Sequence, residues 1–278
     1  MTVDSHHHFW NYSPEQYGWI GDGMDALKRD FGPEDLLAIA EDVGLDGVIS
    51  VQARTIPEET DFLVAYGKAH PFIKGVVGWV DLTKPEAEGA LEAYSMEPLV
   101  KGFRHVLQGE PDERYMLRED FNRGVAKLHD FGFVYDILIK HFHLPHTPAF
   151  VDQHEGQIFV IDHIAKPRIE TDSPDENWVS GMREVAKRSN VYCKVSGMAT
   201  EVVDGVEWTP ELLFPYFETV LEAFGPERLM FGSDWPVCLL ASEYRRWIET
   251  VRGWVVPLSK DEQSQVMGGS AVEAYDLA

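Results

Sequence analysis

The chain has 278 residues, and 24 Lys and Arg against 47 Asp and Glu give a formal net charge of −23. A hydrophobic content of 44% and a charged content of 26% are typical of a globular protein and exclude collagen-like and disordered chains. No Lys/Arg-rich patch offsets the negative charge, so we expect neither nucleic acid nor an anionic membrane as a partner.

The cysteines and the first residues of the chain indicate the cellular compartment of the protein. The two cysteines, Cys193 and Cys238, form no Cys-x-x-Cys motif, which argues against a disulfide framework and a structural zinc knuckle. The first residues carry neither the basic nor the apolar region of a signal peptide, and no apolar run approaches about 18 residues. The sequence therefore predicts a cytoplasmic protein.

Short apolar, β-branched segments alternate with helix-like segments along the whole chain. The expected strands begin near residues 2–3 and continue at 47–52, 73–80, 99–104, 133–139, 157–162, 191–196 and 228–232. The expected helices cover 33–43, 58–69, 85–94, 119–131, 144–155, 178–189 and 210–224, and 243–253 and 261–274 follow the last strand. Eight such units without a linker predict one domain over residues 1–278, a single (β/α)8 TIM barrel. An open doubly wound sheet is the alternative, but no Gly-rich turn follows the first strand.

Polar residues stand at the end of every expected strand. In a (β/α)8 barrel, the active site gathers at the carboxyl ends of the strands. Core packing does not readily explain polar residues at all eight strand ends. In chain order, these residues are His6 and His8, Gln52 with Arg54 beyond it, Trp79 and Asp81, Arg104 and His105, Lys140 to His143, Asp162 and His163, Lys194 and Ser196, and Ser233 to Trp235.

Three histidines and one aspartate form the candidate catalytic group. His6 and His8 are two residues apart on a strand, so their side chains share one face. With His163 and Asp234 they suit zinc or a similar divalent ion. They equally suit metal-free acid–base chemistry with Asp234 as the base. The structural alternatives are a chance histidine pair, a buried structural His163 and a helix-capping Asp234.

Seven further residues are candidates for substrate binding. Arg104 suits a carboxylate or the hydroxyls of a polyol, with a surface salt bridge as its alternative. Lys194 suits a substrate contact or an ion pair, and the tryptophans suit either a sugar-sized pocket or the core. The candidates are Trp19, Gln52, Arg104, His105, His143, Lys194 and Trp235.

These motifs together resemble the lactonase branch of the amidohydrolase superfamily, with bacterial L-fucono-1,4-lactonases and L-rhamnono-lactonases as the most similar members. The resemblance runs nearly end to end and rests on residues 4–10, 17–20, 102–105, 162–167, 193–197 and 231–237. It implies a (β/α)8 barrel that hydrolyses a sugar lactone, an aldono-1,4- or 1,5-lactone such as L-fuconolactone, to the aldonic acid.

The resemblance also suggests roles for the candidate residues. Asp234 would activate water, while His6, His8 and His163 would polarise the carbonyl group. They would do so either directly or through one divalent ion, for which zinc is the first candidate. Binuclear members of the superfamily bridge two metals with a lysine or glutamate from the fourth strand. Here that strand ends in Arg104 and His105, so we do not expect two metals.

Three other functions remain open from the sequence. A hydrolase of carboxylated or sulfonated lactones from aromatic catabolism would need at least two cationic residues in the pocket, drawn from Arg104, Lys194, Arg54 and Arg114. A lactone isomerase or a decarboxylase could use the same barrel, and so could a catalytically inactive binding protein. A serine hydrolase is disfavoured because neither Ser196 nor Ser233 lies in a Gly-x-Ser-x-Gly motif.

Overall fold

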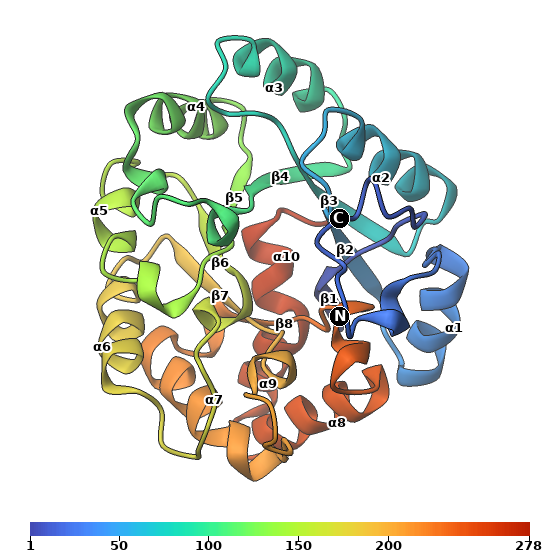
Figure 1. The fold of residues 1–278 in the computed structure, drawn as a ribbon, viewed down its shortest axis with the longest axis vertical. Helices are drawn as coiled ribbons and strands as arrows, with labels where there is room; N and C mark the ends of the chain where they lie inside the picture. Colours follow the sequence, from blue (N-terminus) through green and yellow to red (C-terminus); the bar gives the residue numbers. More distant parts are fainter.

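A single barrel of eight parallel strands forms the centre of the molecule (Figure 1). The computed structural model describes all residues 1–278. The strands are β1 (Val3–His7), β2 (Gly47–Val51), β3 (Ile73–Gly78), β4 (Val100–His105), β5 (Val134–Ile137), β6 (Phe159–Ile161), β7 (Val191–Val195) and β8 (Leu229–Phe231). Each strand pairs in parallel with the next one in the chain. The predicted fold class is confirmed.

The barrel closes between its first and last strands. An isolated parallel bridge joins His7 to Trp235, just beyond β8. The amide of His8 donates to the Trp235 carbonyl over 2.7 Å, and the amide of Asp234 donates to the His6 carbonyl over 2.8 Å. This seam brings together residues that are more than 200 positions apart in the sequence, and these include three of the four candidate catalytic residues.

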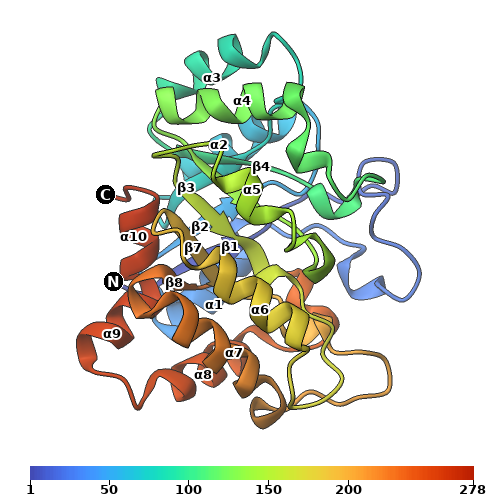
Figure 2. The same ribbon diagram turned by 90° about the vertical axis from the view of Figure 1, so that its left-hand side faces the viewer.

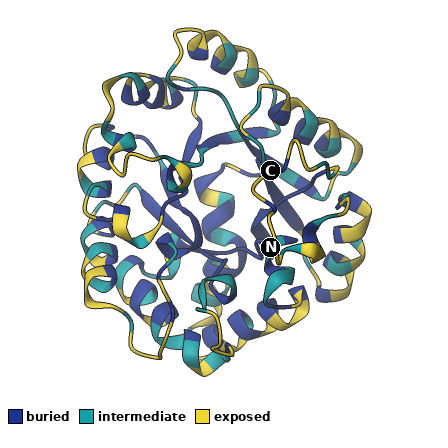
Figure 3. Cartoon of the chain, viewed as in Figure 1, coloured by how far each residue is buried: buried dark blue, intermediate teal, exposed yellow.

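Helices surround the barrel and expose their outer faces (Figure 3). The surrounding helices are α1 (Pro33–Val43), α2 (Glu58–Ala69), α3 (Ala87–Ser95), α4 (Glu119–Asp130), α5 (Thr147–Val151), α6 (Glu176–Val185), α7 (Pro210–Phe224) and α8 (Tyr244–Val255). The short helices α9 (Lys260–Ser264) and α10 (Ser270–Ala274) follow them. None of them is both long and apolar enough to cross a bilayer.

Two helices differ from the sequence prediction. The segment 144–155 holds only the short α5, because Pro148 confines the helix start and Gly156, at φ 82°, turns the chain back. The segment 261–274 is interrupted by a π-helical turn, Gln265–Gly269. There Gly268 packs so tightly on the N-terminal backbone that a Cβ atom would lie 2.3 Å from the Met1 carbonyl oxygen.

The C-terminal segment plugs one end of the barrel. Figure 1 shows α10 within the ring of strands, and Figure 2 places it on the side of the N-terminus. Side chains of α10 and the residues after it pack with strand residues such as Ile49, Val160 and Met230 in a twelve-residue apolar cluster. Because this end is filled, a ligand can reach the barrel only from the carboxyl ends of the strands.

We expect Met230→Ala to lower the free energy of unfolding by about 2–5 kcal/mol, since it leaves a cavity in this apolar cluster. Met230 is fully buried, whereas Met96 is 83% exposed, so Met96→Ala is the matched control and should change stability by less than about 0.5 kcal/mol. Urea unfolding measures both. Equal effects would show that the cluster does not support the barrel.

Candidate active site

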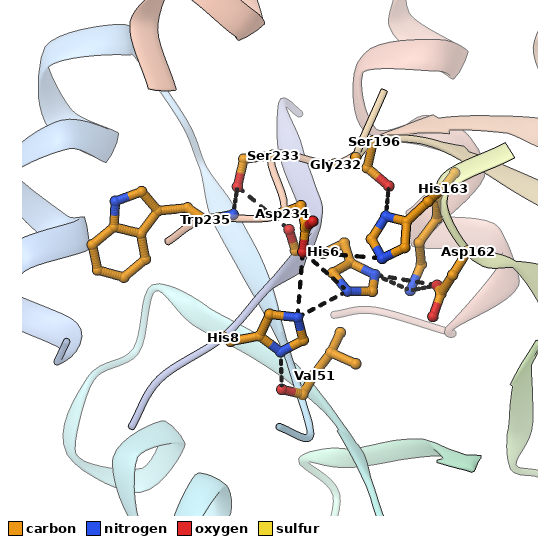
Figure 4. A network of polar contacts seen from close by, with 12 residues as sticks. His6, His8, Val51, Asp162, His163, Ser196, Gly232, Ser233, Asp234 and Trp235 are labelled. Atoms are coloured by element: carbon orange, nitrogen blue, oxygen red, sulfur yellow. Dashed lines mark hydrogen bonds and ion pairs between the residues drawn. The ribbon is translucent and has the colours of Figure 1, made fainter. Parts of the chain in front are cut away.

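The four predicted catalytic side chains meet at the carboxyl end of the barrel (Figure 4). His6 Nε2 and His8 Nε2 are 3.2 Å apart. Asp234 Oδ1 lies 3.4 Å from His8 Nε2, 3.8 Å from His6 Nε2 and 4.0 Å from His163 Nε2. All four residues are buried. Ligand atoms of His6, His163 and Asp234 all lie within 4.8 Å of one another, as the residues that hold a metal ion do.

Left-handed backbone turns His163 and Asp234 toward this point. Residues 163–166 have φ between 46° and 59°, and Asp234 has φ 57°. Left-handed backbone costs a non-glycine residue about 1–2 kcal/mol, and such strain clusters at functional sites. The neighbouring Gly197 has φ 66°, and a Cβ atom there would lie 2.7 Å from His163 Nδ1. The imidazole of His163 therefore has its space only because residue 197 is glycine.

Hydrogen-bond partners set the tautomer of His8 and favour one tautomer of His6. His8 Nδ1 lies 2.8 Å from the Val51 carbonyl oxygen, which only accepts, so Nδ1 carries the hydrogen. Arg104 Nη1, which only donates, lies 3.2 Å from His6 Nε2, and His6 Nδ1 lies 3.1 Å from Asp162 Oδ1 and 3.2 Å from Lys194 Nζ. With its hydrogen on Nδ1 toward Asp162, His6 presents its Nε2 lone pair toward Arg104 and His8, and the Nε2 lone pair of His8 faces His6 and Asp234. Lone pairs oriented in this way by outer partners fit a bound divalent cation.

Burial sets the charge of the group. It lowers the pKa of His6 well below the ordinary value and that of His163 to about 3, so both rings are neutral at pH 7. Burial alone would raise the pKa of Asp234. Its interactions with His163, His8 and Lys166 outweigh burial and lower that pKa below 3.8. The site therefore presents an ionised carboxylate beside the neutral imidazoles of His6 and His163.

Asp162 is a buried carboxylate behind His6, and its role was not predicted from the sequence. Asp162 Oδ2 accepts from Arg104 Nη1 over 2.9 Å, and Oδ1 lies 3.0 Å from Lys194 Nζ. Burial would raise the pKa of Asp162, but the charge of Lys194, the hydrogen bond from His6 Nδ1 and the charge of Arg104 hold it well below the ordinary value. Asp162 thus stays ionised and orients His6.

A second missed carboxylate, Asp136, continues this network toward the barrel floor. Lys194 Nζ donates to Asp136 Oδ2 over 2.5 Å, and the Tyr275 hydroxyl donates to Oδ1 over 2.7 Å. The available signal was a charged residue in the middle of an apolar strand, because Asp136 stands between Tyr135 and Ile137 in β5. Such a residue needs a buried partner of opposite charge.

A cavity of about 650 Å³ opens above the four residues. Of the predicted site residues, His8, His163 and Asp234 line it together with Trp19, Gln52, Arg104 and His105. Its walls also contain residues that the sequence analysis did not assign to the site, including Gln16, Met24, Gln108, Glu110, Leu138, Lys166, Glu201, Val237 and Leu240.

Three predicted substrate-binding residues lie outside the cavity wall. Lys194 is fully buried beneath His6 in the ion pairs with Asp136 and Asp162. Trp235 packs its indole against the rings of Phe9 and Phe31. His143 is buried, with Nδ1 3.2 Å from both backbone groups of Lys140. Contact of these three residues with a substrate remains a prediction.

Three cationic side chains line the cavity, and the hydrogen-bond donors of two of them are bound to other side chains of the protein. Arg104 donates to the Gln52 side chain over 2.6 and 3.1 Å, besides its bonds to Asp162 and His6. Arg54 donates to Glu59 Oε2 over 2.6 Å and to Gln16. The third cation, Lys166, faces Glu201 at 3.4 Å. With Glu110, Glu201 and Asp234 also on the wall, the cavity has no excess of positive charge.

Comparison with known proteins places this geometry in a family. The model of the family Amidohydro_2, described as amidohydrolase, matches residues 3–277. This chain belongs to the amidohydrolase family. The match over nearly the whole chain agrees with the resemblance seen in the sequence motifs.

Individual relatives of this amidohydrolase are similar over their full length. An L-fucono-1,5-lactonase of Burkholderia multivorans is 39% identical, with 100% of this chain and 96% of that protein covered. An L-fucono-1,5-lactonase of Burkholderia ambifaria is 32% identical over 100% of this chain and 96% of that protein. A solved amidohydrolase structure from Burkholderia multivorans with bound zinc has a TM-score of 0.94 and 39% identity over 100% of both chains. The lactonases are named for the 1,5-lactone, whereas the sequence motifs suggested 1,4-lactonases as the most similar proteins.

We expect Gly197→Ala to destabilise the amidohydrolase more than Gly205→Ala does. Both residues have positive φ, but a Cβ atom at 205 would meet nothing within 4 Å, whereas at 197 it would collide with the His163 ring. Gly205→Ala should therefore cost only the backbone strain, about 1–2 kcal/mol, and Gly197→Ala should cost measurably more. Denaturant unfolding compares the two variants. Equal losses would mean that the ring of His163 shifts freely.

Proposed function

We propose that this amidohydrolase hydrolyses a neutral sugar lactone, an aldono-1,5- or 1,4-lactone such as L-fuconolactone, to the aldonic acid. The observation that carries the proposal is the ionised Asp234 carboxylate, which faces three imidazoles at the base of a cavity without excess positive charge. The full-length similarity to two L-fucono-1,5-lactonases supports this substrate class. The cytoplasmic location remains a prediction from the sequence.

In the proposed mechanism, Asp234 acts first as a base and then as an acid. Its carboxylate takes a proton from water, and the water oxygen bonds to the carbonyl carbon. The bond between that carbon and the ring oxygen then breaks, and Asp234 returns the proton to the ring oxygen. The products are a free hydroxyl group and a carboxylic acid that ionises at pH 7.

Two groups can stabilise the negative charge that develops on the carbonyl oxygen. His163 Nδ1 lies 2.8 Å from the Ser196 hydroxyl, which can donate to it, so His163 Nε2 is free to carry a hydrogen toward the substrate. The Arg104 guanidinium, whose donors are bound to internal partners, contributes only the electric field of its positive charge beside His6. Donors that are oriented before the reaction commonly give the largest single contribution to such catalysis.

A divalent metal, zinc in our proposal, would be held by the Nε2 atoms of His6, His8 and His163 and by Asp234. His163 would then carry its hydrogen on Nδ1 and donate it to the Ser196 hydroxyl, so the Nε2 donor described above belongs to the metal-free enzyme. The lone pairs of His6 and His8 that face each other support this, as does the zinc in the solved relative. When bound, the ion would polarise the carbonyl group as a Lewis acid.

The cavity disfavours carboxylated or sulfonated lactones from aromatic catabolism. That reading needs at least two free cations, but Arg104 and Arg54 are occupied by internal partners. Lys194 and Arg114, which the sequence offered as further cations, do not line the cavity. No feature of the structure favours a lactone isomerase over a lactonase, so the proposal rests on hydrolysis.

A pH-indicator assay with a lactone panel tests the function. We expect rapid hydrolysis of aldono-1,5- or 1,4-lactones and no hydrolysis of dicarboxylate lactones. Each lactone is assayed in parallel with and without a chelator. Loss of activity in chelator, restored by zinc, would indicate a required metal, and unchanged activity would indicate that the side chains suffice. Hydrolysis of the dicarboxylate lactones alone would overturn the proposed substrate class. Activity on none of the lactones would overturn hydrolysis itself.

Asp234→Asn should reduce kcat by several orders of magnitude, because the amide cannot take a proton from water. The side chains are nearly equal in size, so circular dichroism should show a folded protein. Asp204→Asn, at an exposed loop position, is the control and should keep wild-type kcat. A kcat for Asp234→Asn within tenfold of wild type would remove Asp234 from the base role.

The pH profile should have no acidic limb near pH 6. A lowered pKa keeps Asp234 ionised above about pH 4, and His163, with a pKa of about 3, stays neutral over the same range. The active protonation state is therefore fully present at neutral pH and is lost only as the pH falls through these low values. We expect kcat/KM to be flat between about pH 5 and 7. A decline centred near pH 6 would show that a histidine with an ordinary pKa controls the reaction.

A further inference from the structure

Lys166 is the one cation on the cavity wall whose hydrogen-bond donors are mostly unused. Arg104 and Arg54 spend theirs on Gln52, Asp162, Glu59 and other internal partners. An ammonium group has three N–H donors, and the Lys166 group has a single carboxylate neighbour, Glu201 Oε1, at the long distance of 3.4 Å. The Lys166 side chain is 17% exposed at the cavity wall. A cation with free N–H donors at such a position can bind oxygen atoms of a ligand.

The backbone places Lys166 beside the catalytic group. Lys166 ends the left-handed turn that begins at His163, and both side chains line the cavity, while Ile164 and Ala165 between them are fully buried in the core. The imidazole of His141 hydrogen-bonds the Lys166 carbonyl over 3.1 Å and holds the end of the turn. The positive charge of Lys166 also lowers the pKa values of His163 and Asp234, which agrees with its nearness to both.

We propose that Lys166 contacts the ester group of the substrate and the carboxylate that hydrolysis produces. This inference rests on the proposed lactonase function. The lactone is neutral, negative charge develops on the carbonyl oxygen as water adds, and a full carboxylate remains after the ring opens. The ammonium donates hydrogen bonds to these oxygen atoms without transferring a proton, and Glu201 keeps it directed into the cavity.

Lys166→Met, Lys166→Arg and the control Lys260→Met test this role. Lys260 is exposed on α9, away from the cavity. On a lactone that wild type hydrolyses, we expect Lys166→Met to lower kcat about 100-fold, a typical effect of removing one donor to developing charge. Lys166→Arg should keep activity within about tenfold, and Lys260→Met should equal wild type. Calorimetric titration with the aldonate product should show weaker binding to Lys166→Met than to Lys166→Arg.

A structural role for Lys166 predicts a different pattern. If the lysine only supported Glu201 or the turn, Lys166→Met would lower the melting temperature but would not weaken product binding. Propylammonium ions would then not restore activity to Lys166→Ala, whereas a direct contact predicts such rescue. A kcat for Lys166→Met within threefold of an active wild type would overturn the inference alone. A wild type inactive on every lactone would overturn the proposed function and this inference with it.

Discussion

The site depends on one buried charge, the carboxylate of Asp162. A buried carboxylate without partners is very unfavourable, and here His6, Arg104 and Lys194 all lie within 3.1 Å of it. These contacts orient His6 and hold Arg104 beside it. They also keep Lys194 beneath the site instead of in the cavity. Lys194 in turn pairs with Asp136, and the Tyr275 hydroxyl donates to Asp136, so the polar network that begins at Asp162 extends to the barrel floor.

The hydrogen bonds of Arg104 and Arg54 explain why the cavity suits an uncharged ligand. Arg104 and Arg54 are held by Asp162, Gln52 and Glu59, so neither is free to bind an anion. What remains on the wall is one partly free ammonium group, several carboxylates and side chains such as Trp19 and Leu240. Carboxylates accept hydrogen bonds from hydroxyl groups and repel anions, and apolar side chains pack on the carbon face of a ring. A hydroxylated, uncharged ring is the ligand that meets both conditions.

Much of the fold and the centre of the site could be predicted from the sequence. The strands were readable because apolar, β-branched runs recur between amphipathic helices, and the rule that parallel strands share one carboxyl end assembled His6, His8, His163 and Asp234. Depth along the barrel was not readable. Lys194 and His8 both stand near strand ends, yet one is sealed below the site and the other lines the cavity. Lys166 was missed because nothing in its local sequence indicates that four successive residues adopt left-handed backbone.

The seam between β1 and the segment after β8 has a consequence for how the molecule loses its site. His6 and His8 stand on one side of this seam and Asp234 on the other. One isolated bridge, two backbone hydrogen bonds and side-chain hydrogen bonds of Ser5, Asp4 and Ser233 join the two sides, without the continuous ladder that pairs the other strands. Proteins open locally before they unfold globally, and pairings without a continuous backbone ladder are among the sites of such opening. A small, reversible separation at the seam would scatter the catalytic group while the remaining seven strand pairings persist. On warming, the enzyme would then lose activity at a lower temperature than the one at which the barrel unfolds. Activity would therefore measure whether the seam is closed.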